Sequence, residues 1–178
     1  MFMSRHLPVA AALLVALAGA DGALAQEKAQ FGRVATPEEI ESWDITVEPS
    51  GAGLPHGAGT AKQGEAVYVA KCQGCHGEKG KGGPALALAG IKGTIGAKTA
   101  SRKTIGTFWP YATTVFDYIF TSMPFQETKS LSHDETYAVT AYLLHLNEII
   151  GENDVIDAQT LPQVKMPNRD NFIQHVKE

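Results

Sequence analysis

The segment Cys72–Gln73–Gly74–Cys75–His76 constrains the fold and chemistry of this chain most, because it holds the only two cysteines among 178 residues. A disulfide within C-x-x-C would close a loop too short to stabilise a fold through loop entropy, since that contribution grows with loop length. A zinc ribbon needs a second pair of ligands. A redox pair of the thioredoxin type follows a strand in a βαβ unit, whereas a helical pattern precedes Cys72.

Two thiols one helical turn apart can form thioethers with both vinyl groups of one porphyrin, and the histidine that follows them then lies beneath the ring. We therefore expect one covalently attached haem c, bound through Cys72 and Cys75, with His76 as an iron ligand. Attachment of this kind takes place outside the cytoplasm, so the motif also predicts an export signal.

The first 25 residues have the three parts of a secretory signal. They are a basic start at Arg5, an apolar run from Leu7 to Ala20, and small residues for cleavage at Ala23–Leu24–Ala25. A membrane span needs about 20 apolar residues, and Asp21 ends this run at 14. We expect a signal peptide over residues 1–25 and an exported, periplasmic product that has no membrane anchor after cleavage.

Charge is distributed unevenly along the mature chain. Between Lys62 and Lys103 eight Lys or Arg residues stand against two Glu, a net charge of +6, and the rest of the mature chain carries −10. Such a dipole can orient docking with a charged protein partner, although ordinary solvated lysines give the same count. No basic run alternates with aromatic residues, so nucleic-acid binding is not expected.

The chain before the haem motif predicts an N-terminal extension and linker over residues 26–59. Thr36–Pro37–Glu38–Glu39 is a helix start, with Thr36 as N-cap and Pro37 at the first helical position, and this helix should end near Trp43. Residues 51–59 contain four glycines and one proline, which is typical of a loop.

Three further helices are predicted, and strand signals are weak, so the fold class is all-α. The first covers Thr60–Lys71, the second Thr113–Thr121 with an apolar side, and the third Ser132–Ile149 after a capping box. The second helix should stop at Ser122–Met123–Pro124, because a proline disfavours helical geometry in the residue before it.

Met123 is the expected second axial ligand of the iron. A thioether opposite histidine raises the reduction potential and suits an electron carrier. The mature chain has two methionines. Met123 lies in a non-helical turn 47 residues after His76, whereas Met166 lies in a tail beyond the last helix, where it should cover the surface.

Residues around the haem are expected to support its ligands and carboxylates. A ligating histidine usually donates its second ring N–H, and the carbonyl near Pro84 is our candidate acceptor. Arg102, Trp109 and Tyr111 are candidate donors to the haem propionates. Aromatic packing is the alternative role for Trp109 and Tyr111.

Taken in order, these features resemble the class I cytochrome c family: a helix, CQGCH, a Gly/Pro loop with Pro84 and Leu86, a Met–Pro turn, and a closing helix. The resemblance implies a class I cytochrome c fold over residues 60–150. In that fold Gly64 and Tyr68 match the positions where the first helix crosses the closing helix at Tyr142. Extensions over residues 26–59 and 151–178 would then wrap the haem domain.

A narrower resemblance covers nearly the whole mature chain. The segments GRVATPEEIESWDI, KTIGTFWPYATTVFDYIFTSMPF, DETYAVTAYLLHLNEII and VKMPNRDNF are similar to the haem subunits and electron acceptors of bacterial sulfite and sulfane (SoxCD-type) dehydrogenases. The sulfane dehydrogenase haem subunit continues into a second haem domain, whereas this chain has one CxxCH. The resemblance therefore implies a mono-haem acceptor or partner of a molybdenum sulfite dehydrogenase.

The expected function is outer-sphere transfer of single electrons without catalysis of its own. Its donor would be a molybdenum sulfite dehydrogenase, and its acceptor a cytochrome or a terminal oxidase. Two other functions stay open: a general periplasmic carrier that feeds a terminal oxidase, and a haem-based ligand sensor or catalytic haem, which needs an exchangeable iron site.

Overall fold

The computed structural model describes residues 32–172. The expected signal peptide (1–25) and the start of the N-terminal extension (26–31) lie outside the described residues. Within residues 32–172, no helix has both the length and the apolar character that a bilayer span requires. The chain divides into two compact units, Met1–Ile40 and Glu41–Glu178.

The boundary between the units falls within helix α2, Pro37–Trp43, which begins and ends where the sequence predicts. Thr36 caps it, because its hydroxyl accepts a hydrogen bond from the Glu39 amide (3.3 Å) and the Glu39 carboxylate accepts one from the Thr36 amide (2.9 Å). The Arg33 guanidinium forms an ion pair with Glu39. This pairing, more than the Thr36 amide, lowers the pKa of the Glu39 carboxyl.

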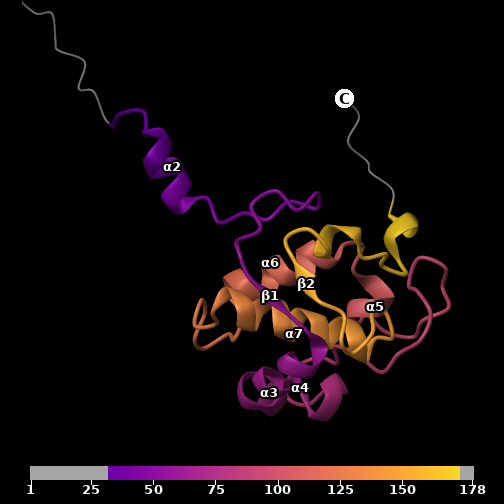
Figure 1. The fold of residues 1–178 in the computed structure, drawn as a ribbon. Coiled ribbons are helices and arrows are strands. Elements are labelled where there is room, and N and C mark those ends of the chain that lie inside the picture. The colour runs from indigo at the N-terminus through magenta and orange to yellow at the C-terminus, as the bar shows by residue number, and fades with distance from the viewer. Residues whose placement is uncertain (1–31, 173–178) are drawn as a thin grey trace, which may run out of the picture. The chain divides into compact units, whose positions relative to one another are not determined.

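Up to residue 172, the second unit is built from helices with one minimal strand pair, so the all-α prediction is confirmed (Figure 1). Its helices are α3 (Ala61–Lys71), α4 (Gln73–His76), α5 (Ile105–Phe108), α6 (Ala112–Ser122) and α7 (His133–Leu146). Short 3₁₀ turns cover Glu78–Gly80 (η1), Leu161–Gln163 (η2) and Arg169–Asn171 (η3). Strands β1 (Ala58–Gly59) and β2 (Ile156–Asp157) pair antiparallel, with Ala58 opposite Asp157.

Helices α3 and α7 cross at Gly64, as the family resemblance implies. A side-chain carbon on Gly64 would overlap the carbonyl of Ala138 and approach Cβ of Tyr142 on α7. The hydrogen atom of glycine therefore lets the two helix backbones approach closely. One turn later on α3, the ring of Tyr68 packs against that of Tyr142, with centroids 5.3 Å apart.

Local signals explain where α6 and α7 end. Helix α6 stops at Ser122, and Met123 before Pro124 is extended (φ −122°, ψ 149°). Helix α7 has the predicted capping box at Ser132 but ends at Leu146, three residues before the predicted Ile149. Glu148 adopts a left-handed conformation (φ 60°). This allows the amide of Ile149 to bond back to Leu144 (3.1 Å) and closes the helix.

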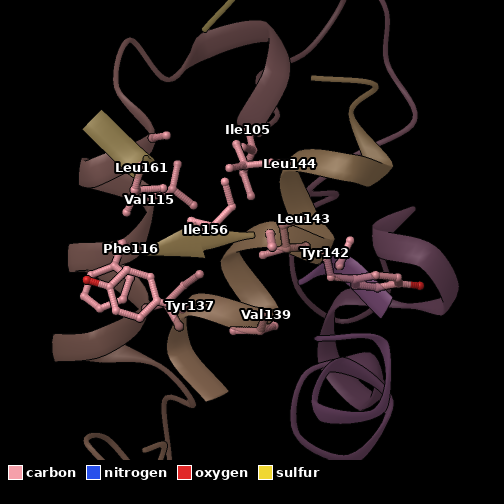
Figure 2. Packing of buried hydrophobic residues seen from close by; sticks show 14 of the residues in the cluster. Ile105, Val115, Phe116, Tyr137, Val139, Tyr142, Leu143, Leu144, Ile156 and Leu161 are labelled. Atoms are coloured by element: carbon pink, nitrogen blue, oxygen red, sulfur yellow. The ribbon is translucent and has the colours of Figure 1, made fainter. Parts of the chain in front are cut away.

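The hydrophobic core lies between α6 and α7, where aromatic rings interleave (Figure 2). The rings of Phe116 and Tyr137 have centroids 4.5 Å apart, and both residues are fully buried. Leu144, Ile156 and Leu161 continue the same core toward the C-terminal extension. This core fixes α6 relative to α7 and so fixes the end of α6, which carries Met123.

Both flanking segments of the second unit bond to its helices. The segment expected to be a linker is hydrogen-bonded to α6 and α7. The carbonyl of Pro49 accepts a hydrogen bond from the Thr113 hydroxyl (3.3 Å), and that of Pro55 accepts one from the Tyr137 hydroxyl (2.8 Å). The C-terminal extension adds β2 and buries Met166 and Asn168. These residues therefore extend the folded unit on both sides of the core helices.

Candidate cofactor cleft

Two cavities of the second unit, of about 620 and 440 Å³, adjoin each other and share part of their lining. Each lies within the size range of typical cofactor pockets. The residues shared by both are His76, Pro84, Ala85, Leu88, Ile119, Met123 and Leu143. We call the two cavities together the cleft. The predicted iron ligands His76 and Met123 line it in common, and its remaining walls are mainly apolar.

His76 is the last residue of α4, and a carbonyl oxygen fixes its ring. Its Nδ1 lies 2.9 Å from the oxygen of Leu86. A carbonyl can only accept a hydrogen bond, so Nδ1 carries the proton and Nε2 is the nitrogen that can bind a metal. The acceptor expected near Pro84 is thus the carbonyl of Leu86, two residues further along the chain, and Pro84 itself lines the cleft.

The loop after His76 explains this shift of two residues. The Gly82 amide bonds to the His76 carbonyl (2.8 Å) and the Ala85 amide to the Cys75 carbonyl (2.9 Å), so the loop folds back tightly on α4. The Ala85 carbonyl accepts from the Gly83 amide (3.0 Å), and the carbonyl that meets the imidazole is that of Leu86. The side chain of Leu86 lines the cleft and is 83% exposed.

Cys72 and Cys75 lie at one end of the cleft, where both line the smaller cavity as free thiols. Burial, together with the neighbouring Cys75, raises the pKa of the Cys72 thiol to about 11. Redox-active and metal-binding cysteines depend on a lowered thiol pKa. The raised value argues against a thioredoxin-type exchange site, as does the helical setting of α3 and α4.

Met123 follows α6 and lines both cavities, so its thioether shares the cleft with the imidazole of His76. Met166 is 4% exposed and packs in the hydrophobic core. It is therefore a core residue where the sequence predicted a surface-covering one. Of these two methionines, Met123 lines the cleft and Met166 does not.

The candidate propionate donors fall in different places. Trp109 lines the larger cavity and packs on Tyr118, with ring centroids 5.7 Å apart. Arg102 and Tyr111 do not line either cavity. Arg102 instead accepts a hydrogen bond from the Thr107 hydroxyl through its backbone carbonyl (2.8 Å), and the ring of Tyr111 lies under the guanidinium of Arg169 (4.4 Å).

Sequence reasoning missed Lys103 and Tyr118, which both line the larger cavity. The Lys103 ammonium lies 4.3 Å from the centroid of the Phe108 ring, another cleft residue. The basic segment around Lys103 was visible in the sequence. The choice between Lys103 and its neighbour Arg102 depends on loop geometry that no local pattern records.

The donor set suits a c-type haem. An imidazole with a free Nε2 and a thioether are ligands that iron accepts in electron carriers. Two thiols stand at one end for covalent attachment, and a lysine lines the larger cavity, able to meet an anionic group. Apolar walls between them would keep water from a bound metal, which would help to set its potential.

Comparisons with known proteins agree with this cleft. Residues 61–147 match the family model described as Cytochrome c. A chain in the crystal structure of the sulfane dehydrogenase SoxCD from Paracoccus pantotrophus is similar, with a TM-score of 0.73 and 41% sequence identity. The match covers 82% of this chain and 72% of that chain. No match was found among curated proteins. This chain therefore belongs to the class I cytochrome c family, whose members carry electrons on covalently bound haem c.

Proposed function

We propose that this cytochrome is a periplasmic, mono-haem protein that takes single electrons from a sulfite or other sulfur-compound dehydrogenase and passes them to a cytochrome or oxidase. The observation that supports it most is the extent of one similarity. The Cytochrome c model covers residues 61–147, whereas the likeness to the sulfane dehydrogenase chain extends over 82% of this chain at 41% identity. A carrier with no relation to such enzymes needs only the haem domain.

The bound haem supplies a one-electron Fe(III)/Fe(II) couple, and the chain supplies its surroundings. Leu86 holds the imidazole of His76 through Nδ1, which keeps Nε2 directed at a fixed position. Met123 offers a soft sulfur that favours the reduced metal. Ile119, Leu88 and Leu143 line both cavities and exclude water. His76 and Met123 would both hold the iron, which would leave no position for a substrate at the metal.

The basic segment between Lys62 and Lys103 is the proposed docking surface for the electron donor. Within the described residues, Lys71 pairs with Glu127 (3.3 Å) and Lys92 with Glu148 (2.7 Å). Lys79 and Lys81 are exposed and have no acidic partner within 4 Å in that part of the chain. They are therefore available to meet an acidic surface and to speed encounter at low salt.

Stopped-flow reduction tests the proposal directly. The full-length haem protein would be mixed with a reduced sulfite dehydrogenase and, separately, with an unrelated periplasmic donor. We expect the dehydrogenase to reduce it at least tenfold faster. Equal rates would favour a general carrier, and spectral change on adding small haem ligands to the oxidised protein would favour a sensor.

Charge reversal at Lys79 and Lys81 tests the docking surface in the same assay. The double variant Lys79→Glu, Lys81→Glu should slow reduction by the dehydrogenase and flatten its dependence on salt. The matched control reverses two exposed lysines outside the segment, Lys129 and Lys165. Unchanged kinetics in the first variant, or the same loss in the control, would remove this surface from the proposal.

A further inference from the structure

The tail beyond the cytochrome core bonds to a loop that contributes residues to the cleft. The match to the Cytochrome c family model ends at residue 147. Residues 166–172, which we call the tail clamp, lie beyond that match. Within the clamp, Asn168 is 2% exposed although its side chain is polar. A buried amide costs stability unless its hydrogen bonds are satisfied. The partners of Asn168 therefore indicate what the tail does.

Asn168 joins the two ends of one loop. Its Oδ1 accepts a hydrogen bond from the Gly96 amide (3.2 Å), and its Nδ2 donates to the carbonyl of Phe108 (2.8 Å). The Ile95 amide also bonds to the Thr107 carbonyl (2.9 Å), which closes the same loop. Between these ends the chain contributes Lys103, Thr104 and Ile105 to the larger cavity. Phe108 at the end of the loop and Trp109 after it also line this cavity.

Other clamp residues contact the same loop or the chain just beyond its end at Phe108. The ring of Phe172 packs edge-on against that of Phe108 (5.5 Å), and Arg169 lies over Tyr111 (4.4 Å). Asn171 donates to Oδ1 of Asn168 (3.0 Å). A side-chain carbon on Gly96 would overlap Asn171, so the loop and the clamp approach each other as closely as glycine allows.

We propose that the tail clamp controls how much water reaches the haem along the wall formed by Lys103–Trp109, with Asn168 as its positioning residue. Asn168 does not line the cleft and acts through Phe108 and the loop. If the wall loosens, water enters and stabilises the more highly charged oxidised haem, so the reduction potential falls. The clamp would thus tune the potential from outside the cytochrome core. This inference rests on the family assignment and not on the proposed electron donor.

The experiment compares full-length haem-loaded variants by hydrogen exchange and by potentiometry. Asn168→Ala removes both bonds of the buried amide. Phe172→Ala is the milder variant, because Phe172 is 45% exposed and its loss should not prevent folding. Leu161→Ala is the matched control: Leu161 is fully buried in the core, lines neither cavity and is not part of the tail clamp.

We expect amides of residues 94–109 to exchange about tenfold faster in Asn168→Ala, in line with the loss of one or two hydrogen bonds. The potential should fall in the same variant, and fall less in Phe172→Ala. Leu161→Ala should lower global stability without either effect. The proposal is overturned if exchange and potential stay at wild-type values in both clamp variants. It is equally overturned if Leu161→Ala shifts the potential as much as Asn168→Ala does.

Discussion

The Nδ1 atom of His76 lies 2.9 Å from the carbonyl oxygen of Leu86, ten residues further along the chain. A backbone carbonyl is supplied by every residue, so no side-chain pattern identifies which one meets the imidazole. The turn after His76 decides it, through its bonds back to α4. The bond fixes the tautomer and the direction of the ring before any metal binds.

Replacing Pro84 by alanine should therefore leave the histidine–iron bond intact. We expect a loss of about 0.5–1 kcal/mol in unfolding free energy, because the unfolded chain gains freedom, and an unchanged reduction potential. Gly83→Ala is the contrasting variant, because its new carbon would meet the Cys75 carbonyl at 2.9 Å and push the loop away. NMR exchange of the His76 Nδ1 proton, with potentiometry, checks both. If the reduction potential falls in Pro84→Ala but not in Gly83→Ala, Pro84 and not the loop would support the imidazole of His76.

Replacing Met123 by alanine should remove the thioether-to-iron absorption band and lower the potential, because Met123 lines the cleft beside His76. Met166→Ala is the matched control. Met166 is buried in the core, so its loss should cost about 2–5 kcal/mol of stability while the band survives. Visible spectra and chemical unfolding separate the two effects. If the band persists without Met123, a residue other than Met123 is the second axial ligand of the iron.

Local sequence signals predicted most helix boundaries, because the groups that cap a helix lie within a few residues of its end. Thr36 and Ser132 cap helices where expected, and Pro124 ends the helix before Met123. The positions that were missed depend on contacts between distant segments. Leu86 meets His76 because of a loop fold, Lys103 replaces Arg102 at the cleft, and Asn168 reaches back 60 residues to Phe108.

Lys103 and Arg102 form a matched pair for testing which cation meets the haem carboxylates. Lys103 lines the cleft and Arg102 does not. A positive charge near the metal favours its reduced state, so Lys103→Gln should lower the potential and change its dependence on pH. Arg102→Gln removes the same charge one residue away and should have a smaller effect. Redox titrations between pH 5 and 9 measure both, and equal shifts would show that only net charge matters.

Alkaline unfolding should depend on the buried tyrosines. Burial raises the pKa of Tyr68 and of Tyr137 to about 12, above the ordinary value of about 10. The folded protein therefore keeps both protons at a pH where the unfolded chain has released them. Their contribution to stability is complete below pH 10 and is lost as the pH rises from 10 to 12. Each tyrosine lowers the unfolding free energy by about 1.4 kcal/mol per pH unit in that window.

Tyr68→Phe isolates one of these contributions. Its hydroxyl donates to the Gly77 carbonyl at 2.7 Å, so the variant should lose about 1 kcal/mol at neutral pH. Between pH 10 and 12, however, its unfolding free energy should fall less steeply, by about 1.4 kcal/mol per unit. Tyr118→Phe is the control: Tyr118 is 48% exposed, and its loss leaves Tyr68 and Tyr137 in place. Denaturant unfolding at several pH values measures the slopes. An identical slope in Tyr68→Phe and the wild type would show that Tyr68 ionises equally in both states.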